Sequence, residues 1–421
     1  MTASAFEDGT ATPKAKQRVL LFGHFGGDNF GNEATLLASL YHLRRLAPTA
    51  ELTCICTRSD AAAAMYGIPA IPIRTPLVKR WNPSGSFTRA IRKLVFVIPH
   101  EIGEWLRSLR TLGGVDALIV PGSGILQDSA TLLEWGPYDM FRWSLAAKLR
   151  GCKLVFLSVG AGPLYTRAGR FLVKTALRVA DYRSYRDEST RQYLKQIWLP
   201  AGTDPVYPDL AFSLPKSLLP TGPNGGAHRP VVSLGLMIEP GRYGSEQPNA
   251  AAHQIYLEAL AAFTRWLLAG EYDLRLVVGD VVDKHVIQEF TSLMQEQGIS
   301  YEENRVIAEP AASTEEFLQQ LAAADFVVAT RFHNALLALL LKKPVLAISF
   351  HHKCTSLMSQ MGLSKYCLDI TRLDSAQMIE RFLDLSTNWD SVGQAVAEQV
   401  GAHRDALNKQ YDIAFGRVYS P

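Results

Sequence analysis

Short segments that are apolar on both faces recur along this chain, and each is followed by a turn and a stretch of helical composition. Residues 326–329 and 345–349 are two such segments, and residues 334–342, rich in Ala and Leu, lie between them. Strands that are apolar throughout are typical of parallel sheets covered on both faces. Parallel neighbours need a crossover, which is usually a helix. The recurring pattern therefore predicts an α/β fold built from βαβ units.

The pattern occurs on both sides of a segment dense in Pro and Gly, residues 213–229, which we interpret as a linker. We predict two doubly wound parallel-sheet, Rossmann-like domains that face a cleft, residues 18–212 and 230–421, with the C-terminal helices in the second domain. Residues 1–17 are small and polar, which favours a disordered tail. The arrangement resembles the GT-B architecture of many glycosyltransferases, but a fold does not decide the chemistry.

Composition excludes several classes of protein. Hydrophobic residues make up 48% of the 421 residues and charged residues 20%, as in ordinary globular proteins. The net charge of +3 is too small for a general nucleic-acid binder. The five cysteines lack a paired CxxC, so neither a zinc site nor a disulfide framework is predicted, and a reducing cytoplasm fits. No secretory signal and no membrane span are predicted.

Two basic side chains interrupt the apolar pattern where a strand meets a helix. Arg331 and His333 follow the segment 326–329 directly. Ligands of open parallel sheets bind outside the carboxyl ends of the strands, where helix N-termini also favour anions. The pair therefore predicts an anion clamp. The alternative is an Arg packed against a carboxylate and a His that caps a turn.

Glycine-rich turns follow three predicted strands, in "GHFGGDNFG", "PGSGILQD" and "VGAGP". The first is not a GxGxxG motif, which argues against a dehydrogenase. Such turns could bring backbone amides close to a phosphate or sugar, or they could be tight strand–helix connections, and both interpretations stay open. The turn residues that we assign to substrate binding are Gly26, Asn29, Gly31, Gly122, Ser123, Gly124, Gln127, Asp128 and Gly160.

Three stretches, taken in order, resemble the polysaccharide pyruvyl transferase family. They are "GHFGGDNFGNEATLLASL", "PGSGILQDSAT" with the following "GCKLVFLSVGAGPL" and "YRSYRDEST", and "TRFHNALLALLLKKPVLAISFHHKCTSLMSQMGL". The resemblance covers roughly residues 18–370. It departs from the family at two places. An Asp-Glu pair of the family is Asn32-Glu33 here, and a frequent Tyr-Asp-Pro-Lys is residues 350–353, Phe-His-His-Lys.

The resemblance implies transfer of the enolpyruvyl group of phosphoenolpyruvate to two sugar hydroxyls, giving a ketal and phosphate. Phosphoenolpyruvate would be a co-substrate, with no cofactor and no metal. Arg331, Arg186 and Lys353 would bind the donor's phosphate and carboxylate. His333 would transfer protons, and Glu33 would be a base near the acceptor. Each has a structural alternative: a salt bridge for Arg186, a solvated charge for Lys353 and a first-turn helix residue for Glu33.

The acceptor implied by this activity is a saccharide, and we expect a lipid-linked oligosaccharide at the cytoplasmic membrane. Two other functions stay open. One is a GT-B glycosyltransferase that uses a nucleotide sugar. The other is a non-catalytic scaffold of polysaccharide assembly, which Asn32 favours. The sugar, its hydroxyls, the ketal stereochemistry and the oligomeric state are not determined by the sequence.

One segment, residues 74–110, breaks the even distribution of charge. It has eight basic residues against Glu101 and Glu104, with Trp81, Phe96 and Trp105 among the apolar residues between them. A basic segment with aromatic residues is typical of contact with an anionic membrane surface. We therefore predict peripheral membrane contact through residues 79–110. The alternative is a pair of ordinary surface helices.

Overall fold

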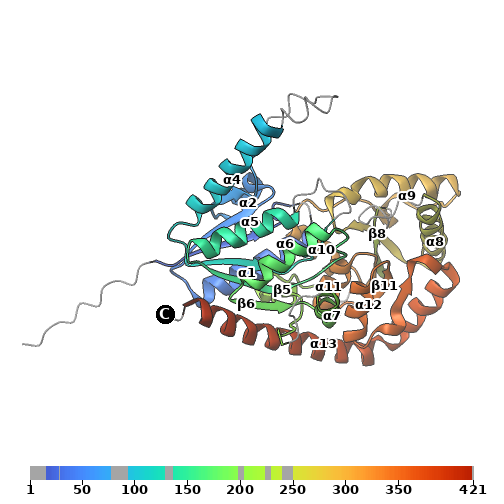
Figure 1. Ribbon diagram of the computed structural model, residues 1–421. Helices are drawn as coiled ribbons and strands as arrows, with labels where there is room; N and C mark the ends of the chain where they lie inside the picture. The colour runs from blue at the N-terminus through green and yellow to red at the C-terminus, as the bar shows by residue number, and fades with distance from the viewer. Residues whose placement is uncertain are drawn as a thin grey trace, which may run out of the picture.

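Two parallel sheets form the framework of the protein (Figure 1). The computed structural model describes residues 16–27, 29–76, 93–128, 136–197, 203–222, 229–238 and 250–419. Among these residues each sheet has six strands, in the orders β3-β2-β1-β4-β5-β6 and β12-β11-β10-β7-β8-β9. Both are the strand order of a doubly wound nucleotide-binding domain. The predicted GT-B-like α/β fold is therefore confirmed.

The first domain is built from residues before the linker. Its strands are β1 Arg18–Gly23, β2 Glu51–Cys56, β3 Ala70–Pro72, β4 Ala117–Pro121, β5 Lys153–Val159 and β6 Tyr182–Tyr185. Its helices are α1 Phe30–Leu46, α2 Ser59–Tyr66, α4 Ile98–Thr111, α5 Gly136–Leu149, α6 Arg167–Arg178 and α7 Glu188–Gln196, with π-helix η1 Lys93–Val97 before α4 and 3₁₀ turns η2 Leu210–Ser213 and η3 Lys216–Leu218. The central strands are buried along almost their whole length, which is why they are uniformly apolar.

The second domain repeats the design. Its strands are β7 Val231–Leu236, β8 Asp273–Val278, β9 Val306–Ile307, β10 Phe326–Ala329, β11 Val345–Ser349 and β12 Cys367–Asp369. Its helices are α8 Ala250–Ala269, α9 Lys284–Glu296, α10 Thr314–Ala322, α11 Phe332–Leu340 and α12 His352–Gln360, followed by α13 Ser375–Tyr419. Strands β10 and β11 have the predicted bounds, and α11 begins two residues earlier than predicted.

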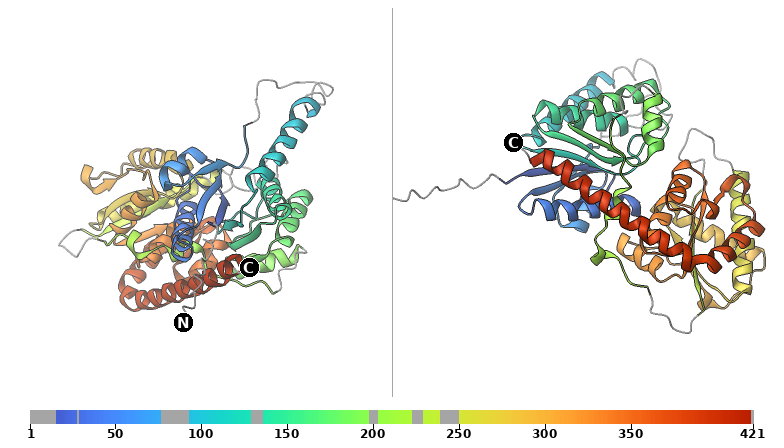
Figure 2. Two further views of the ribbon diagram at one scale, coloured as in Figure 1. Left: turned by 90° about the vertical axis from the view of Figure 1, so that its left-hand side faces the viewer. Right: turned by 90° about the horizontal axis from the view of Figure 1, so that it is seen from below.

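Helix α13 does not belong to the second domain alone, which corrects the predicted domain boundary. It begins on the second domain and then crosses to the first, as the red helix in Figure 2 shows. Gln410 accepts a hydrogen bond from Ser158 Oγ at 3.0 Å and donates to Ser184 Oγ at 2.6 Å. Tyr411 stacks on His42 at 4.1 Å. The far half of α13 is therefore part of the first domain. The predicted tail lies mostly outside the described residues.

The N-terminus of α1, a helix of the first domain, contacts the second domain. Phe30 N donates to Gly279 O at 3.2 Å, and Asn29 Nδ2 donates to Asp280 Oδ2 at 2.8 Å. The rings of Phe30 and Phe317 stack at 5.1 Å. These bonds fix the first turn of α1 beside the carboxyl ends of the second sheet.

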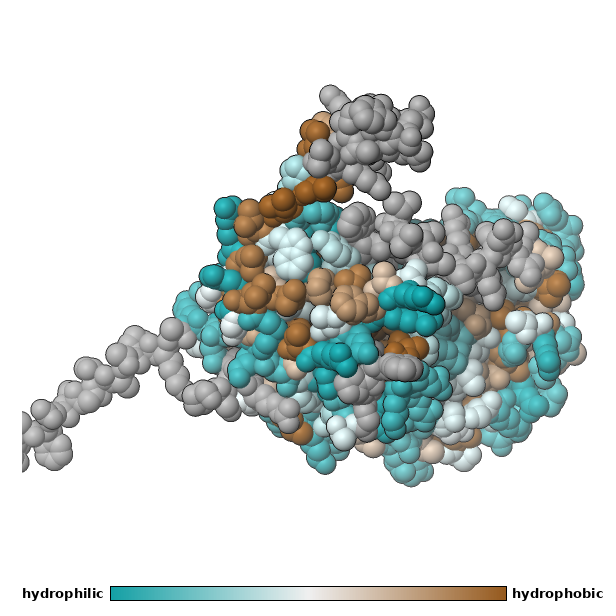
Figure 3. Space-filling model, in the orientation of Figure 1, coloured by the Kyte–Doolittle hydropathy of each residue, from teal (hydrophilic) through white to brown (hydrophobic). Residues whose placement is uncertain are grey.

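Helix α4 buries polar side chains and exposes apolar ones, which is the reverse of an ordinary surface helix. Its buried residues are polar, Glu104 and Ser108, because Glu104 pairs with Arg142 of α5 and with Arg107. Several of its apolar residues are instead exposed, and with residues of the preceding π-helix they form what we call the α4 stripe: Val95, Phe96, Ile98, Ile102 and Leu106, with exposed fractions of 46–56%. Figure 1 shows α4 projecting from the body, and Figure 3 shows apolar residues along it.

Candidate functional site

The N-termini of three helices meet at the junction of the two domains. Helices α7, α11 and α12 begin directly after β6, β10 and β11, at the carboxyl ends of these strands. Each helix end carries partial positive charge and peptide N–H groups without a partner in the helix. A basic side chain lies at each of them: Arg186, His333 and Lys353, which we call the basic cluster. The sequence analysis had singled out all three.

Arg186 is buried at the centre of this cluster. Its Nε lies 3.4 Å from Asp187 Oδ2, and its Nη1 lies 3.4 Å from Asp209 Oδ2. Its guanidinium carbon is 4.7 Å from the centre of the Phe332 ring, a cation–π contact that links the two domains. Nη2 is buried and has no hydrogen-bond acceptor among the described residues. Arg186 thus keeps a buried N–H group for an anion.

His333 lies against Asp209, a carboxylate that the sequence analysis did not identify. Nε2 of His333 is 3.7 Å from Asp209 Oδ2, the distance of an ion pair rather than of a direct hydrogen bond. Burial favours the neutral form of Asp209, but His333 and Arg186 outweigh it and lower the pKa of Asp209 to about 2. Asp209 is therefore ionised at neutral pH and holds both basic side chains.

Lys353 is in the first turn of α12. Burial and the neighbouring charge of Arg186 lower the pKa of Lys353 to about 7, although Asp187 acts in the opposite direction. The ammonium group is therefore poised to gain or lose a proton near neutrality. An anion bound beside it would favour the charged form.

Each member of the basic cluster packs against a glycine. A Cβ on Gly31 would lie 1.9 Å from His333 Nδ1, and one on Gly160 would lie 2.7 Å from Arg186 Nη2. A Cβ on Gly124 would lie 3.1 Å from Lys353 Nζ. Contacts under about 3 Å leave no room for a side chain, so Gly31 and Gly160 are needed for the present positions of His333 and Arg186, whereas a Cβ on Gly124 would require Lys353 to shift by a few tenths of an ångström. The three glycines come from three different segments of the first domain.

Asn334 adds a second kind of polar group. It is buried, and neither its amide oxygen nor its nitrogen has a hydrogen-bond partner among the described residues. Nε2 of His333 is likewise buried without a hydrogen-bond partner in that part of the chain. Native proteins satisfy most buried polar atoms, and the exceptions need an explanation such as a ligand. These atoms and Arg186 Nη2 point to a bound polar molecule.

Arg331 has a different task from the one predicted. Its Nε and Nη2 lie 2.5 and 2.7 Å from the two carboxylate oxygens of Asp283, which is fully buried. Asp283 also accepts a hydrogen bond from Ile238 N at 2.9 Å. The bidentate pair engages the guanidinium inside the second domain, so the alternative of an Arg packed against a carboxylate describes Arg331. Arg186 and Lys353 are therefore the candidates for the predicted anion clamp.

Glu33 also has a structural task. It is buried, and its Oε1 accepts hydrogen bonds from Gly26 N and Gly27 N, each at 2.8 Å. Its Oε2 accepts from the hydroxyl of Tyr66, whose pKa is raised by burial and by this carboxylate. A carboxylate held in this way shapes the glycine-rich turn. The geometry therefore does not support a general base at Glu33 opposite Arg331.

Asn29 is a helix cap. Its side-chain oxygen accepts from Gly31 N at 3.0 Å and Asn32 N at 3.2 Å, and its nitrogen bonds to Asp280. It therefore fixes Gly31 against His333 without being placed to bind substrate itself. Gly26, with φ of 121°, allows the close approach to Arg58, whose Cβ would be 2.5 Å from a Cβ there.

The turns after β4 and β5 bond mainly to each other. Gly122 N donates to Leu157 O, and Gly160 N donates to Ser123 O, both at 2.7 Å. Gly122 and Ser123 have φ of 49° and 62°, which makes this a sharp turn. For Gly122 and Gly160 the tight-turn interpretation therefore describes the amides, and neither is left to hold a phosphate.

Two further predicted residues lie after these turns. Asp128 accepts hydrogen bonds from Tyr165 N, Thr166 N and Thr166 Oγ1 at 2.6–3.1 Å, so it anchors the start of α6. Gln127 is exposed, and a Cβ on Gly162 would lie 2.6 Å from its Oε1. Gln127 is the more exposed of the pair.

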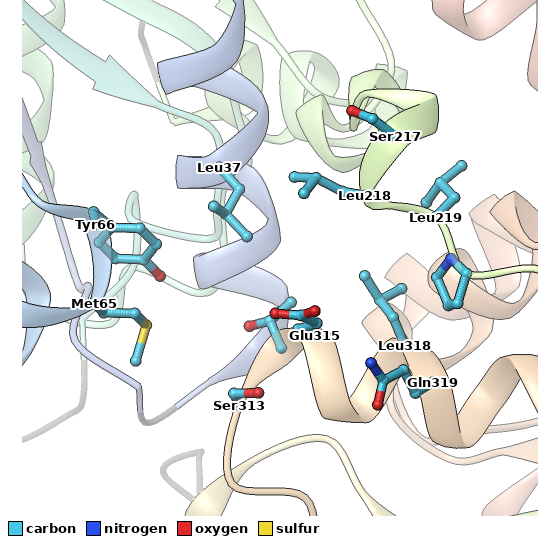
Figure 4. Close-up of a pocket in the computed structure, with 12 residues that line it drawn as sticks. Leu37, Met65, Tyr66, Ser217, Leu218, Leu219, Ser313, Glu315, Leu318 and Gln319 are labelled. Atoms are coloured by element: carbon cyan, nitrogen blue, oxygen red, sulfur yellow. The ribbon is translucent and has the colours of Figure 1, made fainter.

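Two pockets of the described residues bear on ligand binding. The α7–α12 pocket, of about 350 Å³, is lined by Ala161, Gly162, Pro163, Ser189, Thr190, Gln192, Tyr193, Gln196, His351 and His352. The α1–α10 pocket, of about 400 Å³, is lined mainly by apolar residues of α1, α2, η3 and α10, including Leu37, Met65, Leu218 and Leu318 (Figure 4). The first adjoins the basic cluster along the chain. Within the described ranges, no group of three His, Cys, Asp or Glu residues could hold a metal ion.

The sequence analysis missed Asp209, Asn334 and Asp283. Asp209 precedes a short 3₁₀ turn and Asp283 ends another, so neither is part of a periodic pattern. Asn334 had a visible signal, since it is a polar amide at the start of an otherwise apolar helix. The partners of the basic residues are distant in sequence, which spacing alone does not reveal.

A model of the family described as polysaccharide pyruvyl transferase matches residues 29–352 of this chain. Among curated proteins, the amylovoran biosynthesis protein AmsJ of Erwinia amylovora is 29% identical over 89 residues. This stretch is 21% of the present chain and 21% of AmsJ. The chain thus matches about a fifth of the length of this relative.

Solved structures share the fold. A UDP-GlcNAc 2-epimerase from Neisseria meningitidis has a TM-score of 0.54 and 11% identity, covering 90% of this chain and 94% of its own. A glycosyltransferase from Rickettsia africae has a TM-score of 0.56 and 10% identity, covering 95% and 99%. At such low identity the likeness shows the GT-B-like architecture alone.

Proposed function

Because this chain belongs to the polysaccharide pyruvyl transferase family, we propose that it is a transferase that moves the enolpyruvyl group of phosphoenolpyruvate onto a saccharide. The observation that supports this donor is the basic cluster at three helix N-termini, in which Arg186 Nη2 and His333 Nε2 have no hydrogen-bond partner among the described residues. Phosphoenolpyruvate carries a phosphate and a carboxylate close together. Arg186 and Lys353 match that charge.

The reaction joins two hydroxyl oxygens to one carbon. One sugar hydroxyl adds to the carbon that bears the phosphate, while the methylene carbon gains a proton and becomes a methyl group. The second hydroxyl then displaces phosphate, so that a cyclic ketal forms. Of the two hydroxyl protons, one is balanced by the new C–H bond and the other leaves with phosphate. Neither oxidant nor reductant is needed.

The residues divide these tasks by charge. Arg186 and Lys353 stabilise the negative charge that develops on the departing phosphate. His333 carries protons to the methylene carbon and from the hydroxyl, and Asp209, 3.7 Å from Nε2, orients its ring. Two domains that close over the donor would keep water away from the activated carbon. No contact among the described residues of this site favours a nucleotide-sugar donor.

Acceptor-dependent release of phosphate tests the proposal. Purified protein is incubated with phosphoenolpyruvate and with lipid-linked oligosaccharides extracted from membranes. The acceptor should gain the mass of pyruvate less one water, in step with phosphate. His333→Ala should lower turnover by ~10²-fold or more. His285→Ala, an exposed histidine outside the site, is the matched control.

Release of a nucleotide from a nucleotide sugar, with no use of phosphoenolpyruvate, would replace the proposal by a glycosyltransferase. No turnover of either donor, together with tight binding of other assembly proteins, would indicate a scaffold. Full turnover in His333→Ala would remove that residue from proton transfer.

We further propose that the enzyme acts at the cytoplasmic face of a membrane, where a lipid-linked acceptor would be. No helix in the described part of the chain is both long and apolar enough to cross a bilayer. The α4 stripe offers another mode of attachment, since exposed apolar faces of this extent indicate an interaction surface. An amphipathic helix can lie in the membrane interface with its apolar face buried.

The charge of the neighbouring sequence favours an anionic lipid surface over a second protein. Residues 79–93, just before the α4 stripe, include five basic residues and no acidic one. Of the aromatic residues in this segment, Trp105 donates from Nε1 to Tyr138 Oη at 3.0 Å, whereas Phe96 has an exposed fraction of 51%. Phe96 is therefore the aromatic residue that we expect to insert, and Trp81 lies outside the described residues.

A further inference from the structure

The α7–α12 pocket is continuous with the basic cluster along three segments of the chain. Ala161 and Gly162 directly follow Gly160, on which Arg186 packs. Ser189 and Thr190 follow Arg186 and Asp187, and His351 and His352 precede Lys353. A molecule in this pocket would therefore lie beside the donor site. Its walls come from both domains.

Most of the side chains that line this pocket are polar but uncharged, beside an apolar wall at Ala161 and Pro163. Ser189, Gln192, Tyr193 and Gln196 have helical spacing and present one face of α7 to it. Of the described residues that line the pocket, none is Asp, Glu, Lys or Arg. Its volume of about 350 Å³ falls in the range of about 300–1,000 Å³ typical of small-molecule sites.

The histidines of the opposite wall are neutral at physiological pH. Burial, with the charge of Lys353, lowers the pKa of His351 to about 3. Its Nδ1 accepts a hydrogen bond from Lys353 N at 3.2 Å, so in the neutral ring Nε2 carries the proton. His351 thus offers an N–H donor, whereas Gln192 and Gln196 offer both donors and acceptors. This mixture suits hydroxyl groups, which donate and accept.

We infer that the α7–α12 pocket is the acceptor subsite and that it holds a neutral sugar unit, with α7 on one side and His351 on the other. The inference rests on the proposed function for the identity of the reaction, but the binding of a sugar can be measured without it. A trianionic donor has no cationic partner among the side chains of this pocket. The sugar hydroxyls would meet the donor at the basic cluster.

Binding is tested first, without turnover. Saturation-transfer NMR is recorded for the full chain with neutral methyl glycosides of galactose, glucose, mannose and N-acetylglucosamine, and with methyl glucuronide. At least one neutral glycoside should bind, and the glucuronide should not. Gln196→Trp, an exposed position at the end of α7, should abolish that signal by filling the pocket. Signals unchanged by this variant would place the sugar elsewhere.

Kinetics then separate this inference from the proposed function. In Gln192→Ala with Gln196→Ala, the KM for the acceptor should rise about tenfold through the lost hydrogen bonds, with the KM for phosphoenolpyruvate unchanged. Gln319→Ala, in the α1–α10 pocket, is the matched control and should leave both values unchanged. The opposite result, a raised acceptor KM in Gln319→Ala alone, would assign the acceptor to that pocket. Loss of pyruvyl transfer in the wild type with retained sugar binding would overturn the reaction but not the subsite.

Discussion

Each basic side chain at the domain junction is positioned by a contact that spacing in the sequence does not reveal. Gly31, Gly124 and Gly160 provide flat backbone against which His333, Lys353 and Arg186 lie. The acidic partner of His333, Asp209, comes from the turn η2 near the linker. Sequence position correctly placed the three basic residues at strand ends. It could not distinguish them from Arg331, because the partner of Arg331 is 48 residues away at Asp283.

Lys353 gives donor binding a predictable pH dependence. Its pKa of about 7 means that the ammonium form is lost as the pH rises above neutrality. The second pKa of the donor's phosphate ester is about 6, so the ester is almost fully ionised at pH 7 and its own charge changes little from there to pH 9. The Kd for phosphoenolpyruvate should therefore rise from pH 7 to pH 9, measured by calorimetry. Lys353→Arg keeps its charge and should flatten this dependence, whereas equal slopes in the two proteins would exclude Lys353 as the source.

Arg331 should matter for stability rather than for the donor. Arg331→Ala leaves the buried side chain of Asp283 without its partner, and removing one partner of a buried ion pair costs about 3–5 kcal/mol. Urea unfolding should show that loss. Asp283→Asn added to the same protein still accepts from Ile238 N and should recover most of it. A stable Arg331→Ala protein with weakened donor binding would return Arg331 to the anion clamp.

At the scale of elements, the strands were predictable because they are buried on both faces. Which face of α4 is buried was not predictable. The sequence predicts helices by placing apolar residues toward the core. In α4 the buried residue is Glu104, which is stabilised because Arg107 and Arg142 surround it and lower its pKa to about 2, against the effect of burial. Arg142 is on another helix, so the reversal depends on a tertiary contact. The sequence indicated membrane affinity for this segment but not which face would provide it.

The α4 stripe should bind anionic vesicles in a way that salt only partly reverses. Phe96→Glu with Ile102→Glu removes the apolar contribution and adds negative charge, and should keep the protein in the soluble fraction during flotation. Leu383→Glu with Ile413→Glu, at exposed apolar positions on α13, is the matched control and should still float. Wild-type protein that does not float at low salt would show that the α4 stripe has another partner.

At the scale of the whole molecule, contacts beyond the basic cluster also join the two domains, among them the first turn of α1 and helix α13. Helix α13 contributes Phe382 to an aromatic cluster in the second domain, with Phe263 and Trp266. It also contributes Gln410 to a buried network in the first domain. The two sheets and their order could be predicted from the sequence. The crossing of α13 could not, since its residues repeat an ordinary helical pattern throughout.

Gln410 should therefore stabilise the first domain. Gln410→Met keeps the volume but removes the hydrogen bonds to Ser158 and Ser184, which should cost about 1–3 kcal/mol. The urea midpoint should fall relative to the wild type. Gln377→Met, at an exposed position on the same helix, should not change it. Equal midpoints for the two variants would show that the network contributes little.

The crossing of α13 also sets an order of assembly during synthesis. A ribosome completes all six strands of the first sheet before it begins the second domain, and domains generally fold as units while they emerge. Gln410 and Tyr411, however, are translated only after every strand of the second sheet. Until then Ser158, Ser184 and His42 lack the contacts that Gln410 and Tyr411 make with them in the folded protein. The domain that is made first is thus the one that is finished last.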